Sequence, residues 1–101
     1  MPLFLIDHHH TDETCPTRNL DMVRGLRQHV SQENAKAMGV NVLGDWVNEA
    51  EHHVVMIVDT ESQAKAEAFA APFGMAGAVT VQMGLTCEAT ARACLGEPAQ
   101  A

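Results

Sequence analysis

Two continuous apolar runs constrain the fold of this chain more than any other feature of its sequence. The first is LFLI at residues 3–6, and the second is VVMIV at residues 54–58. Short unbroken runs of this kind are typical of strands that are covered on both faces. The sequence therefore predicts a sheet in which these two segments are the central strands.

The segments around the two runs predict the other elements of the fold. Apolar residues spaced by three and four positions predict a helix, alternation predicts a strand, and glycine or proline marks the ends of both. The predicted elements are a strand over 2–10, helices over 19–29 and 32–38, strands over 40–47 and 54–58, a helix over 61–71, a strand over 78–83 and a short helix over 85–95.

The main elements follow the order β-α-β-β-α-β, which is that of the ferredoxin-like fold. The predicted fold class is therefore α+β, with a four-stranded antiparallel sheet in the order 4-1-3-2 and both helices on one face. The 101 residues form one ferredoxin-like domain, with a core over 2–86 and a short helix and tail over 87–101. Because nothing in the chain remains to cover the other face of the sheet, we expect a homodimer in which a second copy covers it.

Local patterns predict how the alanine-rich helix begins and packs. Thr60 and Gln63 form a T-x-x-Q capping box at its start. Ala64, Ala68 and Ala71 share a small-residue face that suits close packing against the sheet. The bulkier side chains expected in the core are Trp46, Met56, Phe69, Phe73 and Met83.

The acidic charge of the chain excludes several kinds of partner. Six Lys and Arg residues against 13 Asp and Glu residues give a formal net charge of -7. We expect no nucleic acid and no membrane as partner, because nucleic acids and anionic membranes require a basic surface. No apolar segment is long enough to span a membrane, and the N-terminal run lacks the pattern of a signal peptide. Together with three cysteines, an odd number that suits reduced thiols, these features predict a cytoplasmic protein.

Histidines are concentrated at the predicted end of the first strand. His8, His9 and His10 are consecutive, and Cys15 follows them. Strand alternation places His8 and His10 on one face, with Cα atoms about 6.5–7 Å apart, and His9 on the other face. The antiparallel topology brings the His52-His53 pair to the same end of the sheet. Imidazole and thiolate groups suit a transition-metal ion, which here means zinc, nickel, copper or iron. The candidate metal ligands are His8, His9, His10, Cys15, His52 and His53.

Other interpretations of this cluster stay open. An expression tag is disfavoured, because tags usually hold six or more histidines at a terminus. A polar strand end with hydrogen-bonded histidines, and acid–base catalysis by histidine, both remain alternatives to metal binding. Cys15 precedes a helix and could be a reactive thiol, but Asp12 and Glu13 oppose thiolate formation, which favours a buried or ligand role. Asp7, Asp12 or Glu13 could serve as a further ligand or hold a ligand in place.

Three further residues are interpreted as structural. Cys87 and Cys94 lie seven positions apart, which would place them on one face of a helix, and we interpret them as packing residues. They follow the fourth strand, whose end lies away from the histidines in the predicted topology. His29 stands alone on the first helix, where a structural role is the more common one.

Three segments of the chain together resemble a known group of proteins. They are PLFLIDHHHTDE, GVNVLGDWVNEAEHHVVMIVDTESQAKAEAFAAPF and GAVTVQMGL, and over residues 2–86 they are similar to the small stand-alone dimeric alpha-beta barrel proteins of bacteria. The resemblance implies a ferredoxin-like monomer and a dimer whose two sheets face each other. The superfamily includes cofactor-independent monooxygenases, muconolactone isomerases, haem-dependent chlorite dismutase-like enzymes and a few His-rich nickel-binding proteins.

The His-rich first strand is similar to the nickel-binding group. No catalytic set from an enzyme branch aligns with this chain, so no active site is carried over. A helical histidine can be the axial ligand in the haem-binding members, but the interpretation of His29 as structural makes haem a less favoured cofactor than a metal ion.

The sequence thus predicts a small cytoplasmic metal-binding protein that holds a transition-metal ion through the His-rich strand end and Cys15. The alternative is a small-molecule isomerase or monooxygenase-like enzyme that uses the same histidines in a barrel pocket. A third interpretation is a structural or interaction module without a ligand.

Overall fold

Four strands form one antiparallel sheet in the computed structural model, which describes residues 2–98. The order is β2-β3-β1-β4, which is the predicted order read from the other edge. The two apolar runs therefore occupy the central strands, and the predicted ferredoxin-like α+β fold is confirmed. The strands are β1 (Leu3–His10), β2 (Val40–Asn48), β3 (His53–Thr60) and β4 (Gly77–Gly84).

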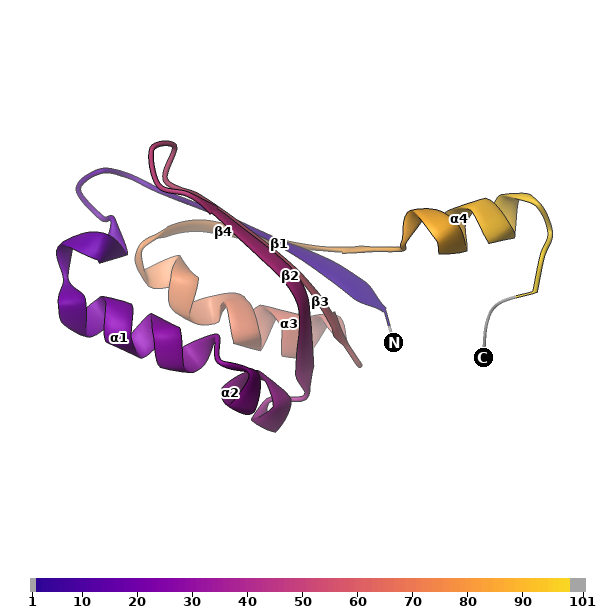
Figure 1. The fold of residues 1–101 in the computed structure, drawn as a ribbon, viewed down its shortest axis with the longest axis horizontal. Coiled ribbons are helices and arrows are strands. Elements are labelled where there is room, and N and C mark those ends of the chain that lie inside the picture. Colours follow the sequence, from indigo (N-terminus) through magenta and orange to yellow (C-terminus); the bar gives the residue numbers. More distant parts are fainter. Residues whose placement is uncertain (1, 99–101) are drawn as a thin grey trace.

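The helices that cover the sheet all lie on one side of it, as Figure 1 shows. Helices α1, α2 and α3 cover this face, whereas α4 extends beyond the sheet near the C-terminal end of the described chain. The other face of the sheet carries no helix in the part of the chain that the structure describes. The helices are α1 (Leu20–His29), α2 (Gln32–Ala37), α3 (Gln63–Ala70) and α4 (Cys87–Cys94), with short 3-10 turns η1 (Pro16–Arg18) and η2 (Ala71–Met75).

The predicted capping box at the start of α3 is wrong. Ser62 caps this helix, and its hydroxyl accepts a hydrogen bond from the backbone N–H of Lys65. Thr60 still belongs to β3, where it pairs with Val40, and its hydroxyl donates to the carbonyl of Gly39 at 2.8 Å. Pairing with β2 extends the strand past the end of the apolar run, so the helix has to begin later.

The predicted small-residue face of α3 is also wrong. Ala64, Ala68 and Ala71 are exposed. The helix instead buries the face that carries Phe69, because an aromatic side chain removes far more apolar surface from water than alanine does. The residues of α3 and η2 that are buried against the sheet are Ala66, Phe69, Ala70 and Phe73.

The core lies between the helices and the sheet face that carries Phe4 and Ile6. The prediction of a core position is confirmed for Met56, Phe69 and Phe73. It is wrong for Trp46 and Met83, which are half or more exposed. Trp46 pairs with Val55 in the sheet and so lies on the face opposite the core.

The first residue of β4, Gly77, lies very close to β1 beside the histidines. Gly77 pairs with His10, and a Cβ atom added at Gly77 would collide with the carbonyl oxygen of His9. Only glycine fits such a close approach of two backbones. This contact holds the end of β1 against its neighbour.

Helix α4 makes little contact with the rest of the domain. It has no buried residue, so the interpretation of Cys87 and Cys94 as packing residues is wrong, and both thiols are exposed. Within residues 2–98, every helix is too short or too polar to traverse a lipid bilayer.

Candidate metal centre

The antiparallel pairing of β1 with β3 brings five of the six histidines to one end of the sheet. His9 lies opposite His53, and the backbone N–H of His10 donates to the carbonyl of His52 at 3.1 Å. The sequence-based expectation of a histidine cluster at this place is confirmed. The structure adds that the cluster is divided between the two faces of the sheet.

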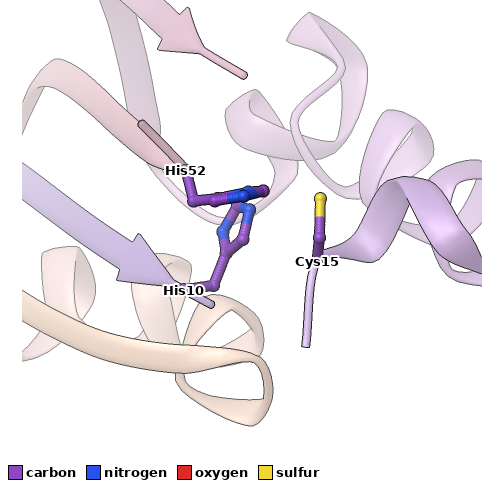
Figure 2. Close-up of side chains that lie close together, drawn as sticks. All are labelled: His10, Cys15 and His52. Carbon is purple, nitrogen blue, oxygen red and sulfur yellow. The ribbon is translucent and has the colours of Figure 1, made fainter. Parts of the chain in front are cut away.

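Strand alternation divides the candidate ligands into two groups. His10 lies on the helix side with His52 and with Cys15, which belongs to the loop after β1 (Figure 2). His9 lies on the uncovered side with His53 and Asp7. In each group, one ligand atom from each residue lies within 4.8 Å of the others. Each group is therefore close enough to hold one ion, and the six predicted residues do not form a single centre.

His8 belongs to neither group, because both of its ring nitrogens already have partners. Its Nδ1–H donates to the carbonyl of Ala78 at 3.0 Å, since a carbonyl can only accept. Nε2 of His8 then carries the lone pair and accepts from Nδ1–H of His10 at 3.1 Å. This chain of hydrogen bonds leaves Nε2 of His10 as the nitrogen with a free lone pair. His8 thus orients His10 in the way that outer residues orient metal-binding histidines.

Burial favours the neutral form of this pair of histidines by lowering the pKa of each. Burial lowers the pKa of His8 below its ordinary 6.5, and the hydrogen bond to Ala78 opposes the shift only in part. Burial also lowers the pKa of His10, and the neighbouring His8 and His52 lower it further. Because a metal ion binds the neutral imidazole, both shifts favour the form of His10 that can act as a ligand.

His52 has an unusual backbone and an unsatisfied nitrogen. Its φ angle is 52°, in the left-handed region that a residue with a side chain rarely adopts. Its Nδ1 atom is buried and has no hydrogen-bond partner in the described chain, and Nε2 lies 3.5 Å from a carboxylate oxygen of Asp12. Such strain and such an orphaned polar atom concentrate at functional sites.

Cys15 is held in place by the loop that follows β1. Within this loop the hydroxyls of Thr11 and Thr14 bond to each other and to the loop backbone. The side chain of Cys15 is buried, and its Sγ lies 2.9 Å from the hydroxyl of Thr17. The predicted alternatives of a buried residue and a ligand are therefore compatible, because the thiol is sheltered and still faces His10 and His52 (Figure 2).

On the uncovered face, Asp7 joins His9 to His53. Nε2 of His53 lies 2.7 Å from Oδ1 of Asp7, and Nε2 of His9 lies 3.2 Å from the same oxygen. The two rings stack, with centroids 4.0 Å apart and planes 13° from parallel. The ring of Trp46 meets His53 edge-on, with centroids 5.3 Å apart. Sequence alternation predicts that Asp7 and His9 share a face, but it gives no sign of Trp46.

An apolar cavity of about 330 Å³ lies beside the helix-side group, between α1 and the sheet. Its lining includes His8, Pro16 and Thr17. Arg27 and Asp45 are the charged residues of the lining. On the side of α1 the cavity is lined by Val23 and Leu26, which are only partly buried. Nothing in the sequence indicates this cavity.

His29 lies away from both groups. Its Nε2 donates to the carbonyl of Phe69 at 2.7 Å, its Nδ1 lies 3.3 Å from the side-chain nitrogen of Asn34, and its ring stacks on Phe69. Both ring nitrogens therefore have protein partners, and His29 joins α1 to α3.

A family model described as "Domain of unknown function (DUF3303)" matches residues 3–96. No curated protein and no solved structure matches the chain significantly. The match covers both groups of candidate ligands and assigns a role to neither.

Proposed function

Because the chain belongs to the DUF3303 family, a family defined by a domain of unknown function, we propose its function from the geometry of the cluster. The protein is a small metal-binding protein that holds a transition-metal ion between His10, Cys15 and His52. Of the six residues predicted as ligands, these three lie together on the helix side of the sheet.

The observation that supports this proposal best is the hydrogen-bond chain from Ala78 through His8 to His10. Both ring nitrogens of His8 have hydrogen-bond partners, as is expected of a histidine with a structural role, whereas only one ring nitrogen of His10 has a partner among the described residues. His10 is oriented through Nδ1, and its Nε2 is left with a lone pair beside a thiol and a second imidazole. The buried Nδ1 of His52 has no hydrogen-bond partner in the described chain, and a bound ligand would give it one.

The donor set favours certain metals. Two imidazoles and one thiolate suit zinc, copper, nickel or iron, and disfavour calcium or magnesium. Three protein ligands leave a fourth position for water or a small molecule, as in zinc sites that are not purely structural. Such a centre fits a role in sensing, storage or redox chemistry. A thiolate ligand needs a reducing compartment, which agrees with the proposed cytoplasmic location.

Cobalt titration tests the proposal directly. The untagged protein carries Cys87→Ser and Cys94→Ser, so that Cys15 is its only thiol. After removal of metals, addition of Co²⁺ under reducing conditions should produce a thiolate-to-metal charge-transfer band that saturates at one ion per chain. Cys15→Ser should abolish this band, and His10→Ala or His52→Ala should weaken Co²⁺ binding at this centre more than about tenfold.

A matched control uses Arg24→Ala, an exposed position on α1 away from the cluster, which should leave the band unchanged. The proposal is wrong if no charge-transfer band develops while circular dichroism shows that the protein is folded. It is equally wrong if the Co²⁺ affinity measured by this band is unchanged in the folded His10→Ala and His52→Ala variants.

A second candidate function is supported by the apolar cavity beside His8. We propose as the alternative that the cavity binds a small, mainly apolar molecule and that the neighbouring histidines act on it as an isomerase or monooxygenase would. Filling the cavity with Val47→Trp should then abolish binding of such molecules, detected as a loss of thermal stabilisation across a small-molecule panel. Retained stabilisation in this variant would exclude the cavity as the binding site.

We further propose that the protein is a homodimer in which a second copy covers the free face of the sheet. The supporting observation is that apolar side chains on this face are exposed to solvent, with Trp46 50% and Ile57 42% exposed. Burial of these side chains would contribute favourably to association.

A further inference from the structure

We propose a second metal centre on the uncovered face of the sheet, formed by Asp7, His9 and His53. It would bind a divalent first-row ion such as Fe²⁺, Co²⁺, Ni²⁺ or Zn²⁺. This centre is distinct from the one proposed between His10, Cys15 and His52, and neither proposal depends on the other.

The distances in this group match those of a metal centre. With metal–ligand bonds of about 2.0–2.1 Å, neighbouring ligand atoms lie about 2.9–3.4 Å apart in octahedral and tetrahedral geometry. The two Nε2 atoms lie 2.7 Å and 3.2 Å from Oδ1 of Asp7, and all three atoms are within 4.8 Å of one another. The three atoms therefore already lie near the separations that ligands of one ion have.

The sheet itself prearranges the three ligands. Asp7 and His9 are two residues apart on β1 and so point to the same side, and His53 lies directly opposite His9 on β3. Cross-strand neighbours of this kind have Cβ atoms only about 4.5–5.5 Å apart. All three ligand side chains thus belong to the two central strands, and paired strands hold side chains more rigidly than a loop does.

The chemistry of this centre differs from that of the helix-side centre. Two imidazoles and one carboxylate, with no thiolate, form the combination found in iron(II) sites with open positions. His9 is 59% exposed at its side chain, so solvent can occupy the remaining positions. When an ion binds, each neutral imidazole moves its proton from Nε2 to Nδ1, and an imidazolium releases one proton.

Ion binding should also change the geometry of the two rings. Their planes are only 13° from parallel, and the Nε2–H groups of both rings lie beside the same oxygen of Asp7. The rings must turn toward each other to bind one ion. Trp46 stands edge-on against His53 and will sense this movement.

The sequence provides a specific probe for this centre. Trp46 is the only tryptophan, and the chain contains no tyrosine, so its fluorescence comes from beside His53 alone. In the Cys87→Ser/Cys94→Ser background, Co²⁺ should quench Trp46 and also produce the charge-transfer band of the Cys15 centre. Total binding should reach two ions per chain.

Variants separate the two centres. His9→Ala and Asp7→Asn should weaken the Co²⁺ affinity that is measured by Trp46 quenching more than about tenfold, and leave the charge-transfer band intact. Cys15→Ser should abolish the band and leave the quenching intact. Because His9 is exposed, His9→Ala should fold normally, which keeps the test valid if Asp7→Asn does not.

Several outcomes would overturn this proposal. One is quenching that is lost in Cys15→Ser and kept in His9→Ala, since the ion that Trp46 senses would then be the one on the helix side. Another is saturation at a single ion per chain with an intact charge-transfer band and no quenching. If the Cys87→Ser/Cys94→Ser protein itself shows Trp46 quenching and one bound ion but no charge-transfer band, the helix-side centre is overturned and this centre is supported.

Discussion

At the scale of single residues, His8 orients His10, a ligand of the proposed metal centre, without being a ligand itself. It is almost fully buried, and it uses one nitrogen to bond β4 and the other to orient His10. Its ring also lies against Phe73, with centroids 5.3 Å apart. A charged imidazolium would disrupt both the packing and the direction of these hydrogen bonds.

The metal-free protein should therefore lose stability in mild acid. The pKa values of His8 and His10 are lowered in the folded state, so below about pH 6.5 the unfolded chain binds more protons than the folded one. The free energy of unfolding should fall as the pH drops from 6.5 toward the folded pKa values, by at most about 1.4 kcal/mol per pH unit for each histidine. Above pH 6.5 their contribution should be constant.

Urea unfolding of chelator-treated protein between pH 5 and pH 8 measures this dependence. His8→Gln retains a donor and an acceptor without titrating, so its slope below pH 6.5 should be smaller than that of the unchanged protein, with the part from His10 remaining. An equal slope in the two proteins would show that burial of His8 does not contribute. The comparison uses slopes, because the substitution itself also lowers stability.

At the scale of elements, β1 determines the arrangement of the site. Its apolar half is recognisable in the sequence as a central strand, and its polar half follows the same alternation, so the separation of His9 from His8 and His10 is predictable. The role of His8 is not predictable in this way. It depends on Ala78, which lies 70 residues away along the chain, and on the close approach of β4 at Gly77.

Other features of the site are set by three-dimensional context. The sequence places Cys15 near the histidines, but only the folded loop shows that it faces His10 and His52. The left-handed conformation of His52 belongs to the β2–β3 turn and has no signature in its residue type alone. The capping of α3 was mispredicted for a similar reason, because pairing between strands extended β3 beyond its apolar run.

Substitution of Gly77 tests the importance of the β1–β4 contact. Gly77→Ala places a methyl group against the backbone of His9 and His10, so the strands must separate, and the free energy of unfolding should fall by about 1–3 kcal/mol. Gly84→Ala at the other end of the same strand has no neighbouring atom within 4 Å and serves as the matched control. Chemical denaturation compares the two variants. A loss for Gly77→Ala no greater than that for Gly84→Ala would contradict this account.

At the scale of the whole molecule, the helices protect only one face of the sheet (Figure 1). The other face presents Leu5, Val55, Ile57 and Trp46 near Asp7, His9 and His53, the ligands of the proposed second centre. This arrangement agrees with the expectation that a second copy is needed to cover the sheet, and it makes association the natural property to measure.

The proposed homodimer predicts that a charge on this face prevents association. Ile57→Lys should raise the dissociation constant at least about 30-fold, the equivalent of about 2 kcal/mol, because the ammonium group would be buried in the interface. Met75→Lys is the matched control, since Met75 is an exposed apolar residue of η2, away from the sheet face. Sedimentation equilibrium measures both. A monomeric unchanged protein, or equal dissociation constants for the two variants, would contradict the dimer.

The alternation along β1 has a further consequence for how the two proposed ions influence each other. Residues 7 and 9 would hold one ion and residues 8 and 10 would serve the other, so the same strand end would link both ions. An ion on one face would therefore act on the same strand end that positions ligands on the other face. Any such influence is reciprocal by thermodynamic necessity, so each metal should change the affinity for the other by the same factor. Metal occupancy on one face of the sheet would then be linked to metal affinity on the other face.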